Sequence, residues 1–93
     1  MVLPGVRDED PDLDGAAEVT VTGRQVLDLA EARRLASSGD GRRIREAHGL
    51  SLAEVGSAVG VSPGAVSKWE HGQRRPFGKP AVAYARLLRV LAS

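Results

Sequence analysis

A run of basic side chains between Lys68 and Lys79 is the part of this chain whose residue types suggest chemistry. Lys68, Arg74, Arg75 and Lys79 fall within it, and Glu70 is the one acid among them. Ammonium and guanidinium groups donate charge-assisted hydrogen bonds to phosphates and carboxylates. The stretch therefore predicts binding of an anion and not a reaction.

Residue patterns typical of catalysis or metal binding are missing from the sequence. There is no cysteine, and the two histidines, His48 and His71, belong to no metal-ligand pattern such as HExxH. No nucleophile pairs with a base in a recognisable constellation, and most of the acids lie near the N-terminus. We expect a protein that is not an enzyme and that takes no cofactor, metal or small-molecule ligand.

The charge of the chain is divided between its two parts. Residues 1–31 hold eight acids and two arginines, a net charge of −6, whereas residues 32–93 hold eleven bases and four acids, a net charge of +7. A basic globular part fits a polyanionic partner such as nucleic acid, but an ordinary arginine-rich surface gives the same count. The net charge alone does not decide between a nucleic-acid partner and an ordinary arginine-rich surface.

The acidic N-terminus is the part that we expect to lack a fold. Residues 1–17 are rich in Asp, Pro and Gly and hold few large apolar side chains, so they predict a disordered tail. It could compete with DNA for the basic surface, contact a partner or simply improve solubility. The alternating segment Glu18–Thr22 predicts a short extended stretch. We divide the chain into a tail, 1–22, and a domain, 23–93.

Helical signals follow from Thr22 onward. Thr22 with Gln25, and Asp28 with Glu31, both fit capping boxes, and the periodicity predicts a helix over about 28–38, with an earlier start left open. Asp40 could cap a second helix over 41–48. The final apolar stripe, which includes Tyr84, predicts a helix over about 80–91.

Two short helices joined by a tight turn stand between these elements. Ser51 and Glu54 form a capping box for a helix over 51–59, and Gly60 suits the turn. Ser62 and Pro63 open the next helix, which we expect over 62–71.

The helix over 62–71 has one apolar side and one polar side. Val66 and Trp69, three residues apart, predict the buried side. The opposite side carries Gly64, Ser67, Lys68 and His71, which are small or can donate hydrogen bonds. A face of this kind can approach another surface closely, and the basic loop follows it at once.

These motifs together resemble the Cro/repressor-type (XRE-like) helix-turn-helix domains of phages and bacteria. The resemblance covers about residues 40–76 and rests on Arg-x-x-x-Gly-Leu-Ser, Gly-Val-Ser at the turn, Val-Ser-x-Trp-Glu and Gly-x-x-x-Pro. It implies an all-α, lambda-repressor-like bundle of about five short helices. It also implies double-stranded DNA as the partner.

The resemblance assigns roles to residues of both motif helices. It implies base contacts in the major groove from Ser62, Pro63, Gly64, Ser67 and Lys68. It implies phosphate contacts from Ser51, Gln73, Arg74 and Arg75, and charge adds Arg42, Arg43, His71 and Lys79 to that set. It further implies an ion pair between Arg45 and Glu70.

Three departures from the family pattern matter. Leu52 stands where a phosphate-contacting glutamine is common, and Gly41 stands where a large apolar residue is usual. Pro63 and Gly64 offer no side-chain hydrogen bonds where family members often read bases. We therefore expect readout to depend on Lys68, Ser67 and DNA shape.

The resulting interpretation is a sequence-specific transcriptional regulator of the small repressor type. We expect a homodimer on DNA, joined through the last helix or Glu18–Thr22, because one short helix reads few bases. With no membrane span and no secretion signal in the sequence, we expect it in the cytoplasm, at the nucleoid. The alternative is an antitoxin-like or adaptor module that binds a protein through the acidic arm.

Overall fold

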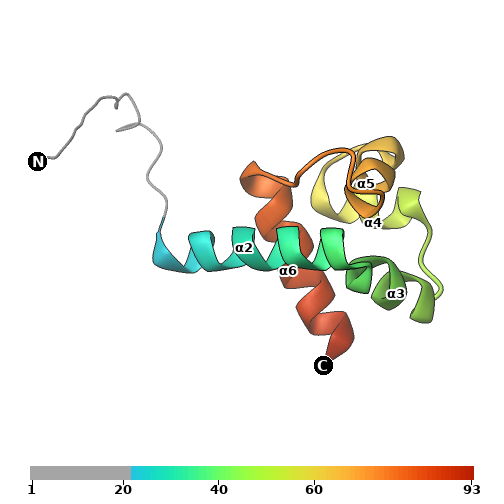
Figure 1. Ribbon diagram of the computed structural model, residues 1–93. Helices are drawn as coiled ribbons and strands as arrows, with labels where there is room; N and C mark the ends of the chain where they lie inside the picture. Colours follow the sequence, from blue (N-terminus) through green and yellow to red (C-terminus); the bar gives the residue numbers. More distant parts are fainter. Residues whose placement is uncertain (1–21) are drawn as a thin grey trace, which may run out of the picture.

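Residues 22–93 are described by the structure, a computed structural model, and every regular element among them is a helix (Figure 1). The predictions of a disordered tail and of an extended segment fall on residues outside this range, apart from Thr22. The all-α prediction is confirmed within it. The helices are α2 (Gly23–Ser38), α3 (Asp40–Ala47), α4 (Leu52–Val59), α5 (Pro63–Glu70) and α6 (Gly78–Ala92).

Helix α2 begins five residues earlier than the periodicity predicts. Thr22 caps it: the Thr22 hydroxyl accepts from the Gln25 amide at 3.1 Å, and the Gln25 side chain accepts from the Thr22 amide at 2.9 Å. This capping box was predicted correctly. The second one was wrong, because Asp28 lies inside the helix and is buried, with Arg86 and Arg89 of α6 as its partners.

The start of α3 also differs from the prediction. Gly39, at φ 86°, ends α2 in the left-handed conformation and is the N-cap of α3. Asp40 is therefore the first residue of α3 and not its cap. Its carboxylate pairs with Arg43 one turn later and lies 3.7 Å from Arg34. One glycine thus joins two helices with no room for a separate capping residue.

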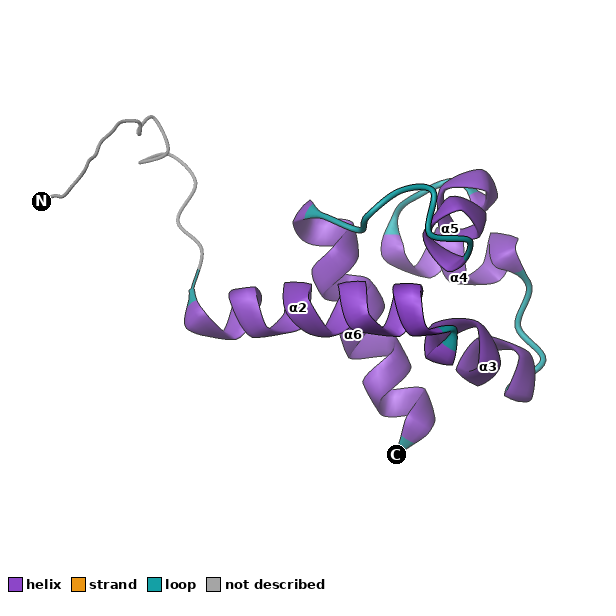
Figure 2. Ribbon diagram, viewed as in Figure 1, coloured by secondary structure: helices purple, strands orange, loops and turns teal. Residues whose placement is uncertain are grey.

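Helix α6 crosses the middle of α2, and the N-terminal half of α2 extends past the bundle (Figure 1). Helices α4 and α5 pack together at one end, and the loop from α5 to α6 runs back across the top (Figure 2). The core lies where α2, α4, α5 and α6 meet. Its buried side chains are Ala32, Leu35, Ala36, Val55, Val59, Val66, Trp69, Ala81, Tyr84, Ala85 and Leu88.

Gly41 is buried although the family resemblance leads one to expect a large apolar residue there. A Cβ added to Gly41 would collide with the Tyr84 hydroxyl and lie 3.3 Å from a methyl carbon of Leu88. The tyrosine of α6 therefore occupies the space that a side chain at position 41 would fill. Its ring meets Trp69 edge-on, with centroids 5.1 Å apart.

Candidate nucleic-acid interface

Two glycines, Gly56 and Gly60, make the tight turn between α4 and α5 possible. Gly60, at φ 88°, makes the turn between them. A Cβ on Gly56 would lie 2.6 Å from the carbonyl oxygen of Val61, so only glycine lets the turn fold back this closely against α4. The sequence predicted the role of Gly60 in the turn.

Helix α5 begins as its sequence predicts. The Ser62 hydroxyl accepts from the Ala65 amide at 3.1 Å, and Pro63 takes the first helical position. At that position its missing N–H removes no helical hydrogen bond. Val66 and Trp69 are buried, so one side of the helix faces the core.

The opposite side of α5 is open. Ser62, Pro63, Gly64 and Lys68 are exposed, and Ser67 is half-buried. These are the five residues that the resemblance assigns to base contacts, and they occupy one face of α5 and the turn before it. Few long side chains stand on this face, so another surface can approach the backbone closely.

The end of α5 turns sharply into the basic loop. Gly72, at φ 71°, donates its amide to the Trp69 carbonyl at 3.1 Å, and the Gln73 amide donates to the Lys68 carbonyl at 2.8 Å. This pair of bonds is a Schellman motif, which satisfies carbonyls that the helix end leaves open. Gln73, Arg74, Arg75 and Lys79 are all exposed beyond it.

His71 and Ser51 also reach the surface, each with a local hydrogen bond. The Nδ1 atom of His71 lies 2.7 Å from the Ser67 carbonyl, where it acts as donor, so Nε2 is the ring nitrogen left to face outward. Ser51 caps α4 and completes the predicted capping box with Glu54. The hydrogen bond that the Ser51 backbone amide donates to the Glu54 carboxylate lowers the pKa of Glu54.

Arg45 and Glu70 tie α5 to α3. The Arg45 Nε atom donates to one carboxylate oxygen of Glu70 at 2.6 Å and Nη2 donates to the other at 2.9 Å. A third donor of the same guanidinium reaches the Leu50 carbonyl at 2.9 Å. The Glu70 carboxylate raises the pKa of Arg45, and both side chains are largely buried. The pair fixes the last turn of α5 against the loop that leads into α4.

Arg42 and Arg43 stand apart from the other phosphate-contact candidates. Arg42 pairs with Glu46 at 3.1 Å on the exposed side of α3, and Arg43 pairs with Asp40. Their charges are already partly neutralised by carboxylates of their own helix.

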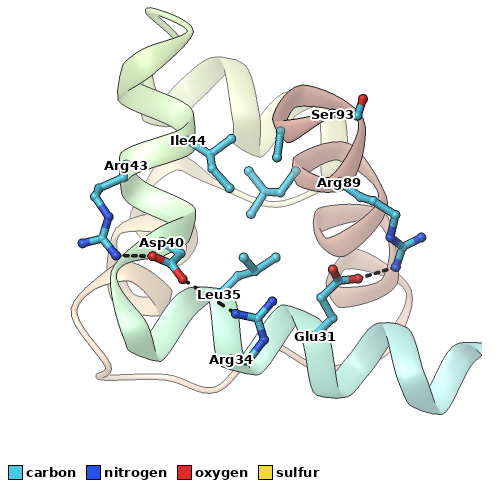
Figure 3. A pocket seen from close by; sticks show the side chains of 10 residues that line it. Glu31, Arg34, Leu35, Asp40, Arg43, Ile44, Arg89 and Ser93 are labelled. Carbon is cyan, nitrogen blue, oxygen red and sulfur yellow. Dashed lines mark hydrogen bonds and ion pairs between the residues drawn. The ribbon is translucent and has the colours of Figure 1, made fainter.

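Arg43 lines a hollow of about 420 Å³ to which α4 and α5 contribute no residue. Figure 3 shows its apolar floor, with Leu35 and Ile44, and ion pairs at its rim, among them Glu31 with Arg89. This hollow is separate from the open face of α5.

Sequence reasoning missed two residues of α2. Asp28 accepts from Arg86 at 3.1 Å and from Arg89 at 2.6 Å, and Arg33 donates to the Pro76 carbonyl at 3.0 Å. The only signal in the sequence is that Asp28–Glu31 and Arg86–Arg89 share a three-residue spacing. That spacing does not say that the two helices meet.

Two further observations concern residues 22–93. None of their helices has the length and apolar character needed to cross a membrane. Nor does that part of the chain bring three or more His, Cys, Asp or Glu side chains together as a metal site.

Comparison with known proteins gives one match. A family profile described as helix-turn-helix matches residues 42–91, which is more than half of the chain and includes α4, α5 and most of α6. Helix α2 lies outside the matched region. Searches of curated proteins and of solved structures gave no significant match.

Proposed function

Because the chain belongs to the Cro/repressor-type (XRE-like) helix-turn-helix family, a family of DNA-binding transcription regulators, we propose that it binds a specific operator with α5 in the major groove. In this proposal Ser62, Pro63, Gly64, Ser67 and Lys68 approach base edges. Ser51, His71, Gln73, Arg74, Arg75 and Lys79 approach phosphates on either side. Arg42 and Arg43 make weaker contacts, since each already has a carboxylate partner.

The observation that carries the proposal is where the basic side chains lie that have no carboxylate partner among residues 22–93. Six arginines have a carboxylate of residues 22–93 within 4 Å: Arg34, Arg42, Arg43, Arg45, Arg86 and Arg89. The basic residues without such a partner in that range are Arg24, Arg33, Lys68, Arg74, Arg75 and Lys79. Four of these six lie on α5, the loop after it or the first turn of α6, and Arg33 contacts that loop. Positive charge that no carboxylate of the described residues pairs, beside an open helix face, suits a polyanion.

We also propose that the protein acts as a homodimer and represses transcription by occupying its operator. Helix α5 has only eight residues, and Pro63 and Gly64 add no side-chain hydrogen bonds to its reading face. Two copies on half-sites about 34 Å apart would double the sequence that is read. The antitoxin-like alternative depends on residues 1–17, and no contact among residues 22–93 favours it.

The test is DNA binding at several salt concentrations. Each phosphate contact that is lost should reduce the slope of log affinity against log salt by about 0.9. We expect Arg74→Ala with Arg75→Ala to weaken binding and to flatten this slope. The matched control is Arg24→Ala, an exposed arginine in the first turn of α2, at the end that extends past the bundle, which should change neither (Figure 1).

Selection of bound sites from a random duplex library completes the test. A palindrome would support the dimer, and a Lys68→Ala variant should then relax the preference at one position of each half-site. If the double arginine variant binds with unchanged affinity and slope, the proposed interface is wrong.

A further inference from the structure

We propose that Arg33 of α2 is a positioning residue for DNA binding, because it holds the loop that carries Arg74 and Arg75 in the shape that meets the phosphates. The inference rests on the proposed function and extends it to α2, a helix outside the matched family region. Its central observation is the hydrogen bond from Arg33 Nε to the Pro76 carbonyl, 3.0 Å long and partly buried.

The loop between α5 and α6 is fixed at two points. At its start, the Schellman motif fastens Gln73 to Lys68, and the Arg74 amide also reaches the Lys68 carbonyl at 3.3 Å. At its far side, the buried Pro76 is held through its carbonyl by Arg33. Arg74 and Arg75 lie between these two points and are exposed.

Little packing supports the loop between those points. A hollow of about 230 Å³ separates it from α2, lined by Arg33, Ala36, Ser37, Trp69, Gly72, Arg74, Arg75 and Pro76. Side chains that border a void have fewer contacts to restrain them. Beside the packing of the buried Pro76, the bond to Arg33 is the direct restraint by which α2 holds this loop.

The charges around this hollow also support a positioning role for Arg33. Arg33, Arg74 and Arg75 line it together, and no carboxylate of residues 22–93 lies within 4 Å of any of the three. Like charges brought together repel unless an anion lies beside them. A phosphate held by Arg74 and Arg75 supplies that anion, and Arg33 keeps the two side chains where they can reach it.

A double-mutant cycle separates positioning from direct contact. Arg33→Ala should weaken operator binding about tenfold in the wild-type background, the effect of losing one hydrogen bond from a charged donor. In the background of Arg74→Ala with Arg75→Ala, the same change should weaken binding less than twofold, because the side chains that Arg33 positions are gone. Arg33→Lys, which keeps a charged donor, should restore much of the affinity.

The matched control is Arg34→Ala, the next residue of α2, which is exposed and lies beside Asp40. It should leave binding unchanged in both backgrounds. Equal losses from Arg33→Ala in the two backgrounds would overturn the proposal, since Arg33 would then contact phosphate independently. Unchanged binding by Arg33→Ala would overturn it as well.

Amide hydrogen exchange of the free protein tests the restraint without DNA. Arg33→Ala should speed exchange at the Gln73 and Arg74 amides, which donate to Lys68, and should leave the α4 amides unchanged. Unchanged exchange at both amides would refute the restraint. If the restraint is found but the wild-type chain binds no DNA, the proposed function fails and the role of Arg33 in the loop stands.

Discussion

The side chain of Tyr84 fills the space that a side chain at position 41 would occupy in a domain with a larger residue there. It is fully buried, it fills the space beside Gly41, and its hydroxyl has no hydrogen-bond partner within residues 22–93. Burial raises the pKa of Tyr84 to about 12, so its neutral form is favoured in the folded protein. The hydroxyl fills space in the core, but burying this polar group without a hydrogen bond reduces the stability of the fold.

We expect Gly41→Ala to lower the free energy of unfolding by about 2 kcal/mol, because the new methyl group collides with the Tyr84 hydroxyl. Tyr84→Phe removes that hydroxyl and should cost less than about 1 kcal/mol by itself, since no hydrogen bond is lost. In the Tyr84→Phe background, Gly41→Ala should therefore be markedly less harmful. Urea denaturation of the four proteins measures this coupling, and additive losses would contradict the packing that we describe.

The sequence predicted contacts within a few residues well and contacts across the fold poorly. Ser51 with Glu54, and Ser62 with Pro63, were predicted because a cap and its partner are close neighbours in the chain. Asp28 was misjudged because its partners Arg86 and Arg89 are 58 and 61 residues away. A capping residue and a buried ionic residue can have identical neighbours in sequence. Arg33 was missed for the same reason, since its partner is a backbone carbonyl 43 residues away.

At the scale of the element, α5 is positioned by its buried side chains Val66 and Trp69 and by what holds its two ends. Ser62 and Pro63 fix the first turn, and the Arg45–Glu70 pair with the Gly72 turn fixes the last. A helix of eight residues is too short to be stable in isolation, so the Arg45–Glu70 pair and the burial of Val66 and Trp69 set its orientation. The family resemblance predicted the Arg45–Glu70 pair, whereas propensity and periodicity could not.

We expect Glu70→Gln to lower the free energy of unfolding by about 3 kcal/mol, because it removes the buried carboxylate that pairs with the largely buried Arg45 guanidinium. The matched control is Glu46→Gln, whose exposed carboxylate lies 3.9 Å from the same guanidinium and should contribute less than about 1 kcal/mol. Chemical denaturation measures both. Similar losses from the two variants would show that burial does not set the strength of this pair.

At the scale of the whole molecule, α2 completes a core that the matched region does not contain by itself. Ala32, Leu35 and Ala36 of α2 are buried against the other helices, and α2 makes its most extensive packing with α6. The ion pairs of Asp28 with Arg86 and Arg89 join the same two helices. The region after residue 40 therefore depends on α2 for part of its stability.

This dependence predicts a loss of stability in acid. Hydrogen bonds from Arg89 and Arg86 lower the pKa of Asp28 below its ordinary value of 3.8, although burial opposes them. A lowered folded-state pKa means that the carboxylate stabilises the fold fully above about pH 4, and that this stabilisation is lost as the pH falls through the folded-state value. Asp28→Asn should therefore be less stable than wild type at pH 7, and the difference should shrink at low pH.

Thermal unfolding between pH 7 and pH 2 measures this difference. Glu46→Gln serves as the control for removing an exposed carboxylate, and its difference from wild type should stay small over the whole range. A gap between Asp28→Asn and wild type that is constant with pH would mean that the Asp28 charge does not join α2 to α6.

The division of α5 into a core side and an open side has a consequence for how such proteins diversify. Val66 and Trp69 carry the packing of the helix, whereas Gly64 and Lys68 are exposed. Under the function that we propose, substitutions on the open side would therefore change which DNA is preferred at little cost in folding. On the same proposal, a gene encoding such a domain would acquire new operators by a few surface mutations, because the scaffold that presents them does not have to be rebuilt.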